Sequence, residues 1–320
     1  MEASASTTHR ISLRSLVSRF SGNPVIVKEL RSRMRGARAF LLITIYLILL
    51  SGLVSAIFFS YISLNSNPTI TTDMIQNLGK TIFGVVIGLE LCMVCFVAPA
   101  LTASAISSER ERQTYDILRT TLLSERAFVL GKLGSALTYL VLLLVVAFPL
   151  QALAYLLGGV NLEELLISFS MLLVTGLALC SLSIFISSIS HRVVGSTVIS
   201  YVATGMVIFG LPILIYIVYI IGMGTALSTG PNVTAAQQSR VEGILLVVGW
   251  LLVSLNPVAS AIVTELILYE NQSFISIMVP LTNGGSVFIL SPWIMYLILL
   301  LLFSLAFIWG SIRFVRRRDH

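Results

Sequence analysis

Charged residues are scarce in this 320-residue chain. Asp, Glu, Lys and Arg together make up 11% of it, whereas they make up about a quarter of a typical soluble domain. Apolar residues make up 57%, and they gather in runs of about 20 residues or more, the length that crosses a bilayer. The composition therefore argues against a soluble domain and indicates an all-α polytopic membrane protein.

Side chains suited to metal or covalent chemistry are also few, with three cysteines and three histidines. Cys92 and Cys95 lie within an apolar run and are expected to pack as small apolar side chains. Two Gly-Lys pairs, at residues 79–80 and 131–132, lack the earlier glycine that a phosphate-binding loop requires. The sequence thus predicts that this chain has no catalytic, metal-binding or nucleotide-binding site of its own.

The basic residues collect beside the apolar runs and do not line one soluble face. This distribution favours a role in membrane topology over nucleic-acid binding. With six spans and a cytoplasmic N-terminus, 18 of the 20 Lys and Arg lie on the cytoplasmic side. Only 14 would do so if residues 244–263 also crossed. The positive-inside tendency therefore predicts six spans in the cell membrane, with both termini cytoplasmic.

The predicted domains follow from these runs. Residues 1–38 are expected to form cytoplasmic amphipathic helices, and residues 313–320 a basic cytoplasmic tail. The transmembrane domain covers residues 39–312, with spans at about 39–64, 81–106, 133–157, 165–189, 193–222 and 290–312. Residues 244–290 are expected to form an external or re-entrant segment that turns at Asn256-Pro257. Any non-helical backbone at membrane depth there must be covered by protein.

A polar island, residues 106–132, separates the second and third apolar runs. A narrow stripe at helical spacing runs along it: Thr114, Ile117, Leu118, Thr121 and Leu122. Charges of both signs cover the rest of its surface. We therefore expect a helix over about residues 108–126 that lies against the membrane surface or a soluble partner.

The second span carries two further features. Gly84 and Gly88 have the spacing that permits close contact between membrane helices. Glu90 is an acid within an apolar run, where a charge costs about 2.5 to 3.5 kcal/mol near the bilayer centre. Two roles for Glu90 stay open, a group that lines a pathway and a carboxyl bonded to a neighbouring helix.

Three strings carry a resemblance to a known family: NPVIVKELRSRMRGARAFLLITIYLILL at residues 23–50, ISSERERQTYDILRTTLLSERAFVLGKL at 106–133 and LNPVASAIV at 255–263. They lie in the right order relative to the spans and resemble the permease subunits of ABC-2 type ABC transporters. The family often has Thr-Pro-Leu-Ser where residues 121–124 read Thr-Leu-Leu-Ser.

The resemblance implies a permease, usually an exporter, with ATP and Mg bound by a separate ATP-binding subunit and with no cofactor on this chain. It also implies a second permease subunit, identical or different. The in-plane connecting helix would include Asn23, Pro24, Lys28, Glu29, Arg31 and Arg35. The island would be the coupling helix that contacts the ATP-binding subunit through Glu109, Arg110, Glu111, Arg112, Thr114, Asp116, Leu118 and Arg119.

Two other classes compete with this interpretation. A secondary transporter would take up solute without an ATPase, and it would show inverted repeats with broken, polar helices at midplane. A membrane scaffold or receptor would bind partners without solute flux. An ABC permease, in contrast, would co-purify with an ATPase.

Overall fold

A computed structural model of the chain describes residues 37–64, 71–113, 124–228, 235–271, 275–280 and 286–317. The long helices are α3 (Ala37–Leu64), α4 (Thr72–Thr102), α7 (Glu125–Leu156), α8 (Leu162–Ile189) and α13 (Pro292–Arg317). A further long segment consists of α9 (Val193–Gly205), the π-helix η1 (Met206–Gly210) and α10 (Leu211–Ser228). Six stretches of these described helices are long and apolar enough to cross a membrane, which confirms the predicted all-α polytopic class.

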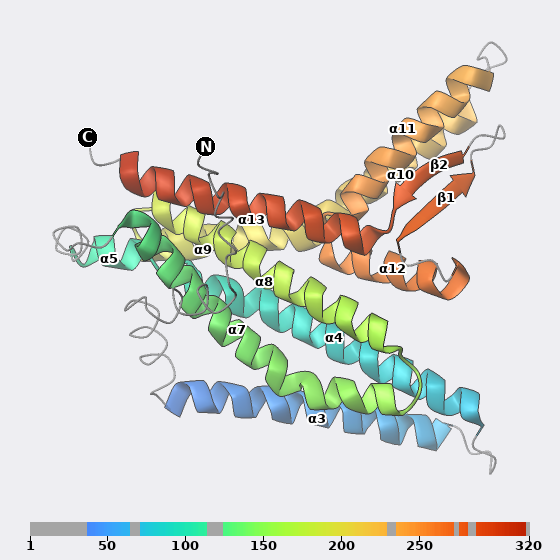
Figure 1. Cartoon of the computed structure of the whole chain (residues 1–320), viewed down its shortest axis with the longest axis horizontal. Helices are drawn as coiled ribbons and strands as arrows, with labels where there is room; N and C mark the ends of the chain where they lie inside the picture. The colour runs from blue at the N-terminus through green and yellow to red at the C-terminus, as the bar shows by residue number, and fades with distance from the viewer. Residues whose placement is uncertain are drawn as a thin grey trace, which may run out of the picture.

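The core lies between α4, α7 and α8. α13 packs along α8, while α3 lies against α4 and α7 on the other side of the bundle (Figure 1). A stripe of α4 faces this core with side chains four residues apart and at most 2% exposed: Ile82, Val86, Glu90, Val94 and Ala98. Side chains at this spacing share one helix face. Packing along that face therefore buries Glu90 among apolar side chains.

The turn between α7 and α8 is fixed by two glycines. Gly158 has a φ of +74°, a left-handed backbone conformation that glycine adopts without strain. A Cβ atom at Gly159 would lie 2.3 Å from the carbonyl oxygen of Gln76 in α4. Only a residue without a side chain allows the turn to approach α4 this closely, so the turn holds the start of α4 beside the α7–α8 hairpin.

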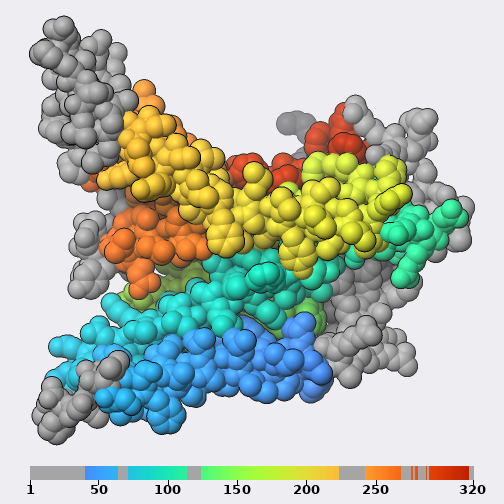
Figure 2. All heavy atoms as spheres, turned by 180° about the vertical axis from the view of Figure 1, so that it is seen from behind, coloured from blue at the N-terminus to red at the C-terminus, as the bar shows by residue number. Residues whose placement is uncertain are grey.

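The described residues 235–271, 275–280 and 286–290 lie beside the bundle. α11 (Ala235–Val253) and α12 (Pro257–Asn271) are bent by 115° at the break between them. The bend rules out one straight crossing by the pair. β1 (Ser276–Pro280) then pairs antiparallel with β2 (Ser286–Leu290). Figure 2 shows α12 between the α9–α10 segment and α4 on one face of the molecule.

The bend between α11 and α12 is held by Asn256. Its side-chain amide donates to the carbonyl oxygens of Val207 and Ile208 in η1, each at 2.9 Å. Its Oδ1 accepts a hydrogen bond from the backbone N–H of Ala259, which caps α12. The π-helix η1 ends at Gly210, two residues before Pro212. The Asn256 side chain, at the predicted Asn256-Pro257 turn, bonds two carbonyls of η1.

The helix expected over residues 108–126 is divided. Residues 107–111 form the short helix α5 (Ser107–Glu111), and Gln113 has a φ of 58°. This left-handed backbone is typical of the residue that ends a helix. Ser124 then accepts a hydrogen bond from the N–H of Ala127 and starts α7, so residues 125 and 126 belong to the third span. Residues 114–123 lie outside the described part of the chain.

Candidate functional site

The polar island is tied to the start of α7 through Lys132. The Lys132 ammonium lies 3.3 Å from a Glu109 carboxylate oxygen and donates a 2.6 Å hydrogen bond to the carbonyl of Ala105. It also lies 5.1 Å from the centre of the Phe128 ring. Lys132 is only 4% exposed. A buried ammonium needs such partners, because burying an unpaired charge costs several kcal/mol.

α5 also bonds to the junction between α8 and α9. The Arg110 guanidinium donates a 2.6 Å hydrogen bond to the carbonyl of Ser188 in the last turn of α8. The Glu111 carboxylate accepts a 2.9 Å hydrogen bond from the N–H of Val193, the first residue of α9. A cation at a helix C-terminus and an anion at a helix N-terminus both complement the helix dipole and satisfy free backbone groups. Arg110 and Glu111 thus stabilise the two ends that meet at this junction.

Serine side chains bond the backbone that precedes α5. The hydroxyl oxygen of Ser187 accepts hydrogen bonds from the N–H groups of Ile106 and Ser107, each at 3.0 Å. Ser196 of α9 donates to the carbonyl of Ala103. We call residues 103–111, with their contacts to α7, α8 and α9, the α5 bracket. The bracket connects the end of α4 to three other helices.

The predicted coupling residues that the structure describes differ in what they contact. Glu109, Arg110 and Glu111 contact the chain's own helices. Arg112 is exposed at the end of α5. The others, Thr114, Asp116, Leu118 and Arg119, lie outside the described residues, as do all the connecting-helix residues at positions 23–35.

Lys132, Ser187, Ser188 and Ser196 are bracket residues that the sequence analysis did not single out. One signal was present, because Lys132 is a basic residue at the start of an apolar run. The serines gave none, since hydroxyls within a membrane helix ordinarily bond their own backbone.

Glu90 lies at the contact between α4 and α7. The side-chain amide of Gln151 donates a 2.6 Å hydrogen bond to its Oε2 atom, and both side chains are 0% exposed. Oε1 of Glu90 and Oε1 of Gln151 have no hydrogen-bond partner within the described residues. The geometry places Glu90 as a carboxyl bonded to a neighbouring helix, one of the two roles that its sequence position left open.

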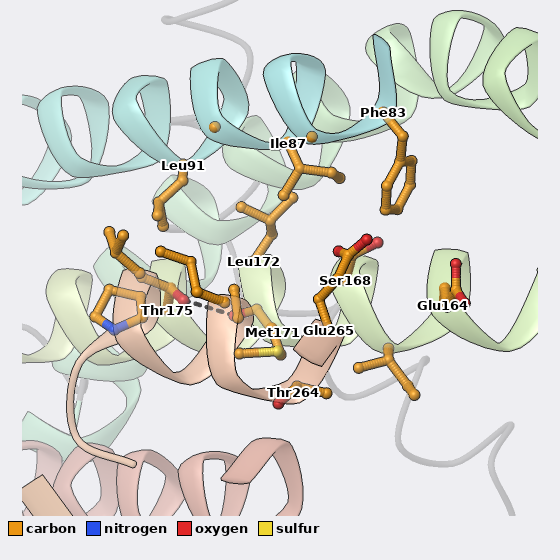
Figure 3. A pocket seen from close by; sticks show the side chains of 17 residues that line it. Phe83, Ile87, Leu91, Glu164, Ser168, Met171, Leu172, Thr175, Thr264 and Glu265 are labelled. Carbon is orange, nitrogen blue, oxygen red and sulfur yellow. Dashed lines mark hydrogen bonds between the residues drawn. The ribbon is translucent and has the colours of Figure 1, made fainter. Parts of the chain in front are cut away.

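A groove of about 500 Å³ lies between α4, α8 and α12. Phe83, Ile87 and Leu91 of α4 face Leu172 and Met171 of α8 across it (Figure 3). Gly84 and Gly88 line the groove, and a Cβ atom at either would meet no described heavy atom within 4 Å. Within the described part of the chain no other helix packs against these two glycines, and their use in contact with another helix stays a prediction.

These elements define a multi-pass helical membrane protein with a polar bracket at one end of its bundle. The sequence matches the family described as ABC-2 family transporter protein over residues 24–318. The match covers nearly the whole chain, and the protein belongs to this family as a permease component. Permeases of this family generally work with ABC ATP-binding subunits. No curated protein matches the chain.

Proposed function

We propose that the chain is the permease subunit of an ATP-driven exporter and that its force comes from a separate ATP-binding subunit. ATP and Mg are bound by that partner, and this chain is not catalytic. Two permease subunits, identical or different, enclose the pathway. The protein lies in the cell membrane with both termini cytoplasmic, as the distribution of its basic residues favours.

The observation that carries this proposal is the α5 bracket. Residues 103–111 bond to α7 through Lys132, to α8 through Arg110 and to α9 through Glu111. A rigid element bonded to several helices moves those helices together when it is displaced, because packed elements shift as units. A partner that pulls on the polar island therefore acts on α4, α7, α8 and α9 at once.

ATP binding supplies the difference between two states in this mechanism. A ligand shifts a conformational equilibrium only if it has different affinities for the two states. ATP closes the partner subunits, and the closed partner favours one arrangement of the bracket and its helices. Hydrolysis removes that preference, so the permease returns to the other arrangement.

Arg112 and the residues of the α5 bracket are expected to have different roles. Arg112 is exposed beyond the bonds of α5 and can contact a partner, since charges at the rim of an interface set orientation and association rate. Arg110 and Glu111 are positioning residues that connect the island to the α8–α9 junction. Partner binding and force transmission are therefore separable by mutation.

The experiment is affinity capture of the full chain from its native membrane, followed by ATPase assay of the purified complex in proteoliposomes. Arg112→Glu is expected to reduce capture of the ATP-binding subunit. Arg110→Ala is expected to retain capture but to weaken the dependence of hydrolysis on the permease by about tenfold. Capture of no ATPase, or uptake of solute by the isolated chain along an ion gradient, would overturn the proposal.

A further inference from the structure

The groove between α4, α8 and α12 is apolar along most of its length. Figure 3 shows Leu91 and Thr175 toward one end, and Glu164 toward the other, on the side of Phe83. The groove lining between these ends consists mainly of side chains such as Ile87, Met171 and Leu172. A cavity of this size and lining is typical of sites for small apolar molecules.

Two glycines keep this groove open. In many membrane proteins two glycines four residues apart, like Gly84 and Gly88, allow a second helix to pack closely against the backbone. Here a Cβ atom at either position would find no described heavy atom within 4 Å. The space beside these glycines, which a packed helix would otherwise fill, is therefore part of the groove.

One end of the groove is acidic. Glu164 comes from the first turn of α8 and Glu265 from α12, and both line the groove. Burial, and after it the Glu164 carboxylate, raise the pKa of Glu265, whereas Lys80 of α4 lowers it. Among the described side chains named here, two carboxyl groups stand against one ammonium. A bound cation would relieve the repulsion between the carboxylates.

We propose that this groove binds an amphipathic organic cation, with its apolar body along α4 and α8 and its cationic group beside Glu164 and Glu265. The proposal rests on the proposed function and names the chemical class of the transported molecule. Charge complementarity selects this occupant, because an acidic end discriminates between ions of the same shape but opposite charge. An acyl chain would use the apolar wall and would gain nothing from the two carboxylates.

The test uses two rigid ions of matched shape, tetraphenylphosphonium and tetraphenylborate, as probes. Binding of each radiolabelled ion to the full-length chain is measured in detergent micelles. Gly88→Leu fills the groove from an open position, so its residual signal is the micelle background. Gly52→Leu is the matched control, because Gly52 of α3 is equally open and does not line the groove.

The proposal expects the phosphonium to bind at least about tenfold more tightly than the borate after this background is subtracted. Glu265→Gln is expected to weaken phosphonium binding about fivefold and to leave the borate unchanged or slightly improved. Gly52→Leu is expected to bind both ions as the unmodified chain does.

Three results would overturn the proposal. Equal binding of the two ions, or no binding above background, would show that the acidic end selects nothing. Loss of a co-purified phospholipid in Gly88→Leu, without charge discrimination, would assign the groove to an acyl chain. Loss of a dimer in Gly88→Leu would assign it to a second copy. None of these results bears on capture of the ATP-binding subunit, so the proposed function is judged separately.

Discussion

Replacing Glu109 by glutamine tests how the polar island is held to the transmembrane bundle. The change removes the carboxylate that lies 3.3 Å from the Lys132 ammonium while keeping the size of the side chain. Lys132, which is only 4% exposed, then loses the carboxylate of this ion pair. The bracket should loosen at its contact with α7.

The magnitude follows from the burial of the two partners. Breaking a fully buried charge pair by removing one partner costs about 3–5 kcal/mol. The Glu109 side chain is 29% exposed, and Lys132 keeps its hydrogen bond to the Ala105 carbonyl and its contact with the Phe128 ring. Solvent screening and these remaining contacts reduce the expected loss to about 1–3 kcal/mol.

The assay is the free energy of unfolding of the full chain in mixed detergent micelles. The double variant Glu109→Gln with Lys132→Met removes both charges, and it should be more stable than Glu109→Gln alone by at least about 1 kcal/mol, because the buried ammonium is removed together with its carboxylate partner. Glu125→Gln is the matched control at an exposed acid of the next helix. A loss below about 0.5 kcal/mol in Glu109→Gln, or strict additivity in the double variant, would refute this account of the pair.

The other predictions concern contacts elsewhere in the fold. Gly159→Ala should destabilise the protein by more than about 2 kcal/mol, because its Cβ would meet the Gln76 carbonyl oxygen at 2.3 Å. In the same unfolding assay Gly52→Ala should be neutral, and equal effects of the two changes would contradict the close approach at Gly159. Asn256→Ala should lower the free energy of unfolding by about 2–4 kcal/mol, since two carbonyls of η1 lose their donor. An unchanged unfolding midpoint would argue against these two hydrogen bonds. Glu90→Gln should be at least as stable as the unmodified chain, whereas Glu90→Ala should be less stable because it removes the acceptor of the 2.6 Å hydrogen bond from Gln151. A transport defect in Glu90→Gln at full stability would instead favour a pathway role for Glu90.

The fold class could be predicted because hydrophobic length is a local property. Apolar runs such as residues 39–64 and 290–312 correspond to helices α3 and α13, with small shifts at their ends. The Asn256-Pro257 turn was also readable, since proline cannot continue a helix that needs its N–H. The 115° bend at this turn agrees with a segment that does not cross in one straight helix.

The α5 bracket could not be predicted from the sequence. Its hydrogen bonds join residues about 80 positions apart, such as Arg110 with Ser188 and Glu111 with Val193. Periodicity shows which residues share a helix face, but it does not show which helix ends meet in space. The sequence analysis predicts that residues 109–111 contact a partner, and in the structure the same residues also contact the chain's own helices.

The groove shows the same limit. The spacing of Gly84 and Gly88 permits close helix contact, but the sequence could not show which element would face these glycines. The break after α11 places α12 where it lines the groove together with α4 and α8. Glu164 and Glu265 therefore line one groove although they are about 100 positions apart in the sequence.

The most direct test of the central claim is ATP hydrolysis measured on the purified chain, first alone and then with the captured ATP-binding subunit in the same proteoliposomes. The account predicts no hydrolysis by the chain alone. With the partner present it predicts hydrolysis whose rate depends on an intact bracket, so that Arg110→Ala lowers the permease-dependent part. Hydrolysis by the isolated chain, or a rate of hydrolysis by the complex that Arg110→Ala does not change, would contradict this account.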